Sequence, residues 1–324
     1  MPEVERALVF GAAGSIGSQV RRALETSTQI RARYIARQRP PRAPLDRSWI
    51  SLDLVAASVG EFAALLQRVE PDVVVNCAGL TTGSPAQLWP VNVGIVDKLL
   101  RALATSTRRI RLIQLGSSAE YGHHEAGTPI GEGDECRPTG PYGQSKLIAT
   151  EMIVDAVAHG DLEATVLRVF NSLGPGAGTH TLAGHAAQAL HAALTDHLPV
   201  VEFGPLDTYR DFVDIRDIAR AVALAIDSEG VLPPILNVGS GSAVMSRTVV
   251  LVLSAIAGYI GQIRETRRQS LRSSDVPWQQ ADTRLMQSAL HWESRIALRE
   301  SLKDLWRLEL RSRGTDRVLD QNAI

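Results

Sequence analysis

Short apolar runs alternate with segments of helical periodicity in the first half of the chain. Strand-like runs cover residues 6–10, 33–36, 72–76, 111–115 and 164–169. Helical spacing of apolar residues covers residues 15–25, 91–104 and 142–159. Alternation of this kind predicts parallel strands whose connecting helices cover both faces of one sheet. We therefore predict an α/β fold built on a doubly wound parallel sheet.

The pattern changes after Asn171. Residues 172–178 are rich in glycine and proline, which predicts a loop. Further along, the pattern predicts helices at 182–194 and 217–226, a loop at 205–211, and a strand at 235–238 that returns to the sheet. We expect residues 1–171 and 211–240 to form the α/β unit, residues 172–210 and 241–310 to form a smaller, mostly helical lobe, and residues 311–324 to form a frayed tail.

A glycine-rich turn joins the first predicted strand to the first predicted helix. Residues 9–17 read VFGAAGSIG. Gly11 permits a tight turn, Gly14 lets the backbone approach a pyrophosphate, and Gly17 lets the helix pack closely on the strand. The helix begins with Ser15 and Ile16, and its free N–H groups attract an anion. The place of this motif at the first strand–helix junction favours a Rossmann-type dinucleotide site over a turn that merely needs glycine.

The residues after the second predicted strand bear on the choice of dinucleotide. NAD sites usually place an acid there, about 20 residues beyond the glycines, to bind the ribose 2′-hydroxyl. This strand ends in YIARQR, which contains no acid. Arg37 and Arg39 can instead pair with a 2′-phosphate, although a solvated basic loop is the alternative. The sequence therefore predicts NADP(H), with NAD(H) less favoured.

Two other segments are expected to contact the cofactor. Asp53 and Leu54 follow a short apolar stretch, and we expect Asp53 near the adenine. The DVVVN strand runs into Cys77, Ala78 and Gly79, at the sheet edge where ligands bind in doubly wound folds. These small residues allow close approach of a cofactor. Cys77 is interpreted as a packed small residue, because nothing around it indicates an activated nucleophile.

Tyr142 and Lys146 are the candidate catalytic pair. They lie four residues apart at the start of a predicted helix, and therefore on one helical face. A lysine charge near a phenol favours the phenolate, which suits Tyr142 as general acid in ketone reduction or base in alcohol oxidation. An ordinary exposed pair is the alternative. Ser117, at the carboxyl end of the preceding strand, can hold the substrate oxygen beside the tyrosine.

Composition narrows the function classes. The 324 residues have a net charge of −1, which gives no general attraction to nucleic acid or to an anionic membrane. Two cysteines, Cys77 and Cys136, are too few for a disulfide framework or a zinc site. No segment offers ~18 uninterrupted apolar residues, and the N-terminus does not read as a signal peptide. We expect a cytoplasmic protein without a metal.

These motifs together carry a family resemblance. GxxGxxG, NCAG, Asn92, SSAEYG and YGQSK resemble the extended short-chain dehydrogenase/reductases of the NDP-sugar epimerase/dehydratase group, over about residues 6–310. The resemblance implies that Ser117, Tyr142 and Lys146 are catalytic. Ser118 takes the place of Ser117 if the loop has lost a residue. By the same resemblance, Lys146 and Tyr142 contact the cofactor, and Asn76 and Asn92 belong to the cofactor site and its supporting network.

Later segments resemble a narrower branch. RVFN with LGPG, YRDFVD and NVGSG resemble further segments of the same family. RSSDVP with LHW is similar to the C-terminal pattern of GDP-mannose 4,6-dehydratases and GDP-4-keto-6-deoxymannose reductases. The resemblance implies that Asn171 contacts a nucleotide-diphosphate sugar, that Arg210 and Arg272 bind its diphosphate, and that Ser117 and Ser118 face the sugar. A glycine usually precedes the tryptophan of LHW. Here that residue is His291, which we interpret as structural.

The residues after the catalytic serine bear on the reaction. Dehydratases of this group carry an acid one or two places after it, whereas Ser118 and Ala119 follow Ser117. Glu120 reaches that place only if Ser118 is the catalytic serine. Arg37 also suits a released NADPH. We therefore favour NADPH-dependent reduction of the C4 ketone of a nucleotide-diphosphate 4-keto-6-deoxyhexose, with GDP as the preferred nucleotide.

Several alternatives stay open. A 4-epimerase or a 4,6-dehydratase would use the same substrate class, and a reductase of a non-sugar ketone would use the same catalytic residues. A dinucleotide-sensing regulator without catalysis belongs to another class, although such a protein has no need of a proton donor. Residues 91–104 and 142–159 have apolar stripes that can pair across a two-fold axis. The resemblance implies a homodimer formed through such helices, although the sequence alone also permits a monomer.

Overall fold

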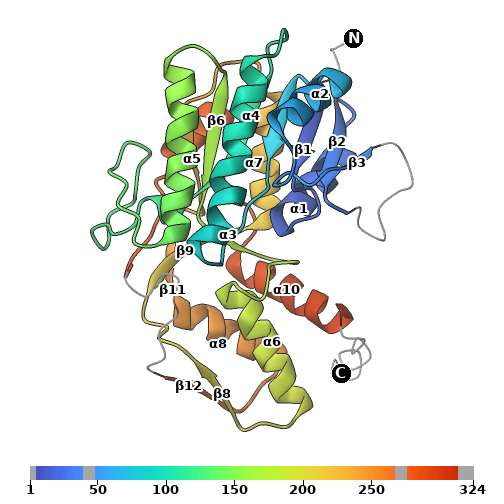
Figure 1. Ribbon diagram of the computed structural model, residues 1–324. Helices are drawn as coiled ribbons and strands as arrows, with labels where there is room; N and C mark the ends of the chain where they lie inside the picture. Colours follow the sequence, from blue (N-terminus) through green and yellow to red (C-terminus); the bar gives the residue numbers. More distant parts are fainter. Residues whose placement is uncertain (1–4, 39–47, 267–275, 313–324) are drawn as a thin grey trace.

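A seven-stranded parallel sheet forms the centre of the larger part of the molecule (Figure 1). The computed structural model describes residues 5–38, 48–266 and 276–312. The sheet order is β10-β6-β5-β4-β1-β2-β3. Its strands are β1 (Glu5–Phe10), β2 (Ile30–Ala36), β3 (Trp49–Ser51), β4 (Val73–Asn76), β5 (Arg111–Ser117), β6 (Ala164–Val169) and β10 (Ile235–Val238). The predicted doubly wound α/β fold is confirmed.

Helices cover both faces of this sheet. Successive side chains of a strand point to opposite faces. Ala7 and Val9 of β1 therefore join one hydrophobic cluster, and Leu8 and Phe10 join the other. The first cluster is completed by α1 (Ser15–Glu25), α7 (Ile215–Asp227) and α9 (Arg284–Leu290). The second is completed by α2 (Val59–Val69), α4 (Ile95–Ala104) and α5 (Pro141–Ala158).

The order of the strands creates a switch point between β1 and β4. From β1 the chain moves outward through β2 and β3, and then returns to place β4 on the other side of β1. Phe10 at the end of β1 pairs with Asn76 at the end of β4. In open α/β sheets, ligands bind outside the carboxyl ends of the strands at such a point. The glycine turn and the NCAG segment are therefore neighbours at the expected place.

The lobe contains a separate hydrophobic cluster. This cluster joins α6 (Leu182–Thr195), α8 (Ser246–Ala257), α10 (Leu298–Ser312) and β8 (Val200–Phe203). Figure 1 shows these helices beside one another, below the parallel sheet. Strand β12 (Gln262–Glu265) pairs with β8. A three-stranded sheet joins β7 (Asn171–Leu173), β9 (Tyr209–Asp214) and β11 (Ala243–Met245).

Strand β9 corrects one expectation. The sequence predicts a loop over residues 205–211, but β9 begins within it, at Tyr209. Arg210 and Asp211 read as polar loop residues, yet both are buried. Burial of such side chains is tolerated because Arg210 donates to the carbonyl of Tyr209 and Asp211 accepts several hydrogen bonds.

The segment around α9 packs on the sheet, although the sequence analysis assigned it to the lobe. Met286, Leu290 and Trp292 are buried in the cluster that contains α1 and α7. The Trp292 indole N–H donates to the carbonyl of Asp217 at 3.0 Å. His291, between α9 and this tryptophan, has φ +49°, in the left-handed region that favours glycine. The proposed division of the chain into two domains stays a prediction.

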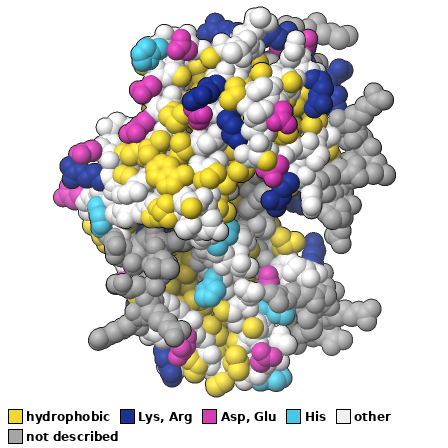
Figure 2. Space-filling view, viewed as in Figure 1, with side chains coloured by type: hydrophobic (Ala, Val, Ile, Leu, Met, Phe, Trp, Pro, Cys, Tyr) yellow, Lys and Arg dark blue, Asp and Glu magenta, His cyan; other side chains and the backbone are white. Residues whose placement is uncertain are grey.

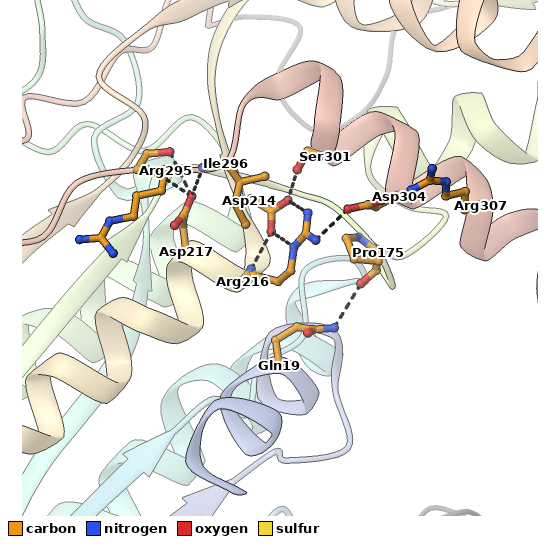
Figure 3. Close-up of polar contacts among 11 residues, drawn as sticks. Gln19, Pro175, Asp214, Arg216, Asp217, Arg295, Ile296, Ser301, Asp304 and Arg307 are labelled. Atoms are coloured by element: carbon orange, nitrogen blue, oxygen red, sulfur yellow. Dashed lines mark hydrogen bonds and ion pairs between the residues drawn. The ribbon is translucent and has the colours of Figure 1, made fainter. Parts of the chain in front are cut away.

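Charged groups join α7 to α10 (Figure 3). Asp214 precedes α7, accepts from the backbone N–H of Arg216 and binds its guanidinium at 2.8 Å. Arg216 also pairs with Asp304 of α10 at 2.8 Å. Asp217 accepts from the backbone N–H groups of residues 295 and 296, which lead into α10. The start of α7 therefore fixes one lobe helix to the sheet.

The described part of the chain, residues 5–38, 48–266 and 276–312, contains no helix that is long and apolar enough to cross a membrane. The same residues contain no group of three or more His, Cys, Asp or Glu side chains that would hold a metal ion.

Replacing His291 by glycine should stabilise the protein. Glycine adopts the left-handed backbone of this C-cap without the steric penalty of a side chain. We expect the free energy of unfolding to rise by a few tenths to about 1 kcal/mol, measured by urea denaturation. His159 is the matched control, because it caps α5 with φ −77°. His159→Gly should give no gain, and an equal gain in both variants would contradict this explanation.

Candidate active site

The glycine turn is packed tightly at two of its three glycines. Gly11 has φ +70°, and a Cβ there would lie 2.6 Å from the backbone nitrogen of Ala78. A Cβ on Gly17 would lie 2.1 Å from the carbonyl oxygen of Gly11. Gly14 precedes α1, and no described side chain caps this helix. The first N–H groups of a helix have no partner within it, so this end of α1 fits the pyrophosphate of a dinucleotide.

The first residues of α1 differ in what their side chains contact. The Ser15 hydroxyl donates to the carbonyl of Gly176 at 2.7 Å. Ile16 packs against the hydrophobic cluster on the α1 face of the sheet. A cofactor anion at this place would therefore meet their backbone N–H groups.

The NCAG segment crosses the end of β1. The backbone N–H of Cys77 donates to Phe10 at 3.0 Å. Asn76 accepts from the backbone N–H of Ala78 at 3.1 Å and donates to Gln114 at 2.8 Å, so its side chain holds the turn. Burial raises the pKa of the Cys77 thiol to about 12, which favours the unreactive thiol. A Cβ on Gly79 would lie 3.8 Å from Nζ of Lys146, so this segment reaches the candidate catalytic lysine.

Asn92 fastens the segment after β4 to helix α5. It lies in a π-helical turn, η1 (Pro90–Gly94), and is buried. Its amide donates to the carbonyl of Leu80 at 2.8 Å and to the Ser145 hydroxyl at 2.9 Å. Its carbonyl oxygen accepts from the backbone N–H of Leu80 at 2.9 Å. These contacts suit the supporting network rather than a direct hold on the cofactor.

Lys146 is buried at the carboxyl end of β5. Its ammonium donates to the carbonyl of Leu115 at 2.5 Å. Burial lowers the pKa of Lys146, while the charge of Glu120 opposes this shift. Tyr142 lies one turn earlier on α5 and is half-buried, and its carbonyl accepts from the Ser145 hydroxyl at 2.8 Å. The two candidate catalytic residues thus begin a helix that packs directly on β5.

The two adjacent serines have different surroundings. Ser117 ends β5, and its hydroxyl oxygen accepts from the backbone N–H of Ala119 at 3.2 Å. Among the described residues, nothing accepts the hydroxyl hydrogen of Ser117. The carbonyl of Ser118 accepts from the amide of Gln279 at 3.0 Å, and its hydroxyl lies 3.5 Å from the Gln279 side-chain oxygen. Ser117 is therefore the freer hydrogen-bond donor.

Glu120 is committed to a buried network. It is fully buried in the short helix η2 (Ser118–Glu120) and pairs with Arg168 of β6 at 2.7 Å. It also accepts from the backbone N–H of Ser117 at 2.7 Å and from the Thr150 hydroxyl at 2.9 Å. The Arg168 guanidinium lies 4.5 Å from the centre of the Tyr121 ring. Glu120 therefore holds β5, α5 and β6 together.

The residues expected at the adenosine end lie near the ends of β2 and β3. Arg37 directly follows β2 and is exposed, and its carbonyl accepts from the Ser51 hydroxyl at 2.9 Å. Arg39 lies outside the described residues. The Asp53 carboxylate accepts from the backbone N–H of Val55 at 3.0 Å, and Leu54 is buried in the cluster that covers the α5 face. The cofactor role of these residues stays a prediction.

Two of the candidate substrate residues lie in the three-stranded sheet. Asn171 of β7 donates to the carbonyl of Asp211 in β9 at 3.1 Å. Arg210 precedes Asp211 in β9 and is buried, and burial lowers the pKa of Arg210 to about 10. A guanidinium held out of water favours an anionic partner. Arg272 lies outside the described residues.

Sequence reasoning missed two residues of this region. Asp211 accepts from the backbone N–H and hydroxyl of Ser240, and from the backbone N–H groups of Gly241 and Ala281. It stands inside the RDF motif, so a signal existed. Gln279 lies just after the RSSDVP segment, but only the folded chain shows that its side chain contacts Ser118.

Comparison with known proteins agrees with this arrangement. The NAD dependent epimerase/dehydratase family matches residues 7–239. The chain is 35% identical over 304 residues to dTDP-6-deoxy-L-talose 4-dehydrogenase (NAD(P)(+)) of Kitasatospora kifunensis, covering 93% of this chain and 94% of that protein. It is 28% identical over 245 residues to GDP-6-deoxy-D-mannose reductase of Pseudomonas aeruginosa, covering 72% and 78%.

A solved structure shares the fold over nearly the whole chain. MoeE5 in complex with UDP-glucose and NAD is 29% identical and superposes with a TM-score of 0.79, covering 95% of this chain and 99% of that one. The nicotinamide cofactor expected from the glycine turn fits these relatives, although they do not decide between NAD and NADP. The chain belongs to the NAD dependent epimerase/dehydratase family. This is a family of NAD(P)-dependent oxidoreductases of the extended short-chain dehydrogenase/reductase type.

Proposed function

We propose that this protein reduces the C4 ketone of a nucleoside-diphosphate 4-keto-6-deoxyhexose with NADPH, and catalyses the reverse oxidation. One observation carries the proposal. A buried Lys146 stands one helical turn from Tyr142, at the strand end that also carries Ser117. Tyr142 supplies the proton donor, Lys146 supplies a positive charge that stabilises the phenolate, and Ser117 supplies a hydroxyl that orients a carbonyl. All three lie at the edge where doubly wound sheets bind ligands.

Each residue of the proposed site has a separate role in the reduction. The N–H groups of α1 hold the cofactor pyrophosphate, and the cofactor supplies the hydride when bound. Tyr142 donates a proton to the ketone oxygen, and the Ser117 hydroxyl donates a hydrogen bond to the same oxygen. The Lys146 ammonium stabilises the phenolate that remains on Tyr142. Arg210 holds the diphosphate of the substrate, and Asn171 lies beside it.

The position of Glu120 argues against dehydration. Elimination of water would need an acid free to approach the sugar. The Glu120 carboxylate accepts hydrogen bonds from Ser117, Thr150 and Arg168 instead, and it is fully buried. Ala119 offers no acid. Neither residue therefore supplies the free acid that the characteristic step of a dehydratase requires.

The nucleotide base is the finer part of the proposal. The sequence analysis favoured GDP. The relative named for a dTDP sugar matches 93% of this chain at 35% identity, whereas the relative named for a GDP sugar matches 72% at 28%. We therefore propose a dTDP sugar as the first substrate, with a GDP sugar as the alternative. A 4-epimerase is the second candidate function, because UDP-glucose 4-epimerase of Streptomyces lividans is 33% identical over 206 residues.

The test follows NADPH oxidation at 340 nm with freshly prepared dTDP-4-keto-6-deoxyhexose and its GDP analogue. We expect stoichiometric oxidation with one of them. Tyr142→Phe should lower kcat by roughly 10²- to 10⁴-fold, because the proton donor is lost, while NADPH binding persists. Tyr259→Phe is the matched control, since its hydroxyl donates to the Leu198 carbonyl in the lobe. Its kcat should stay within about twofold.

Other outcomes would point elsewhere. Interconversion of 4-epimers without net NADPH consumption would favour the epimerase. No turnover of any nucleotide sugar, with Tyr142→Phe indistinguishable from the wild type, would favour a dinucleotide sensor and overturn the proposal.

We propose that Arg37 selects NADP(H) through the 2′-phosphate. Arg37→Gln should raise the KM for NADPH by roughly tenfold to a hundredfold, the effect of losing a charge-assisted hydrogen bond, and leave the KM for NADH within about twofold. Arg31→Gln is the control, because Arg31 is also exposed on β2, near its other end. Equal effects of Arg37→Gln on both cofactors would contradict the assignment.

We also propose a homodimer formed through α4 and α5. Figure 2 shows hydrophobic side chains gathered over these helices. Leu147, Ile148 and Met152 on α5 are only partly buried in the single chain. Met152→Glu should convert a dimer to a monomer in light scattering coupled to size exclusion. Leu251→Glu, at an exposed lobe position, should leave the mass unchanged. A monomeric wild type would exclude the interface.

A further inference from the structure

Helix α1 is fastened to the loop that follows β7. Ser15 donates its hydroxyl to the carbonyl of Gly176 at 2.7 Å, and Gln19 donates its amide to the carbonyl of Pro175 at 3.3 Å. The two donors are four residues apart and therefore share one face of the helix. Figure 3 shows the Gln19 side chain reaching from α1 toward Pro175. We call this pair of contacts the α1 clasp.

The loop held by the clasp, residues 174–178, turns at two glycines. Gly174 has φ +124° and Gly176 has φ +90°, values that side chains rarely permit. A Cβ on Gly174 would lie 3.0 Å from the Asp214 carboxylate. The backbone N–H of Ala177 donates to Gly174 at 3.0 Å. The loop therefore packs against the start of α7 on one side and against α1 on the other.

One end of this loop leads to the proposed substrate residues, and the other leads to a helix of the lobe. Just before it, Asn171 of β7 pairs with Phe212 of β9, the strand that carries Arg210. Just after it, the Thr181 side chain caps α6, the lobe helix that starts at Leu182. The clasp thus connects the helix end that fits a cofactor pyrophosphate to the elements that hold the substrate residues.

We propose that Ser15 and Gln19 couple the two binding sites, so that a cofactor on α1 tightens the binding of the nucleotide diphosphate. This inference rests on the proposed function. A pyrophosphate bound to the N–H groups of α1 restrains the first turn of the helix. The clasp passes that restraint to the 174–178 loop, which then needs less ordering when the substrate binds. Coupling of this kind is reciprocal.

The burial of the Gln19 side chain indicates that its amide does more than fill space. Gln19 is only 7% exposed, although it lies on a helix of which the outer positions are solvated. A buried amide is unfavourable unless it is hydrogen-bonded, and an apolar side chain would fill the same space without that requirement. The Gln19 amide meets this requirement through its hydrogen bond to the carbonyl of Pro175.

The first experiment uses NADPH alone, with amide hydrogen exchange as the readout. In the wild type, NADPH should slow exchange of the Ala177 and Thr181 amides by threefold or more. In the double variant Ser15→Ala, Gln19→Leu, NADPH should bind but leave these amides unchanged. Ser18→Ala is the control, since the Ser18 hydroxyl donates to the Ser15 carbonyl within α1. It should behave as the wild type.

The second experiment measures the coupling itself by calorimetry, with dTDP and GDP as probes. NADP⁺ should tighten binding of the preferred nucleotide by roughly fivefold or more in the wild type, and by less than twofold in the double variant. Equal tightening in both proteins would overturn the proposal, as would loop protection that survives the double substitution.

The two proposals fail in different ways. If the cofactor protects the loop through the clasp but no nucleotide sugar is turned over, the reaction is wrong and the coupling path stands. If turnover is rapid and the double variant keeps full protection and full coupling, the reaction stands and the clasp is only structural.

Discussion

The buried ion pair between Glu120 and Arg168 is the constraint on which the site geometry depends. Both side chains are out of water, and their charged atoms lie 2.7 Å apart. Removal of one partner of such a pair leaves an unpaired buried charge and costs about 3–5 kcal/mol. Glu120 also accepts from the backbone N–H of Ser117 and from the hydroxyl of Thr150, whereas Nη1 of Arg168 has no hydrogen-bond partner among the described residues. The end of β5 and helix α5 therefore have one relative position.

The relative position of β5 and α5 determines which side chains are free to act on a substrate. Glu120 binds Ser117 through the backbone N–H of that serine, so this contact leaves the hydroxyl hydrogen for another acceptor. Because Thr150 and Lys146 are on the same helix, the ion pair also fixes where the lysine ammonium lies. The acid of the SSAEYG motif thus belongs to the scaffold that orients the proposed proton-transfer residues. An acid given to the scaffold cannot also protonate a leaving hydroxyl.

The sequence predicted those parts of the fold that local periodicity encodes. Helix α1 and strands β6 and β10 have the predicted bounds, because each is a regular pattern next to clear turn residues. Strand β9 was missed because its polar residues are buried through distant partners. The position of α9 against the sheet was also missed, because the apolar face of this helix is short and its packing partners lie in α7 and β10, far away in the sequence.

The candidate site likewise has residues that local motifs predict and contacts that only the folded chain shows. Motifs indicated the glycine turn, Tyr142 and Lys146, because the chemistry needs those residue types at fixed spacing. The contact of Gln279 with Ser118 joins residues 161 positions apart, and no local pattern predicts it. The separate surroundings of Ser117 and Ser118 likewise appear only when the segment after residue 276 is in place.

Two kinds of anchor hold the loops at the carboxyl edge of the sheet. Glu120 and Asp211 are buried carboxylates that accept several hydrogen bonds each, and such anchors release their loops only at high energetic cost. The 174–178 loop is held to α1 differently, by two neutral hydrogen bonds from one helix face. Neutral bonds of this kind contribute about 1 kcal/mol each. The binding energy of a ligand is enough to shift that balance, so this loop is the part of the edge best suited to respond to one.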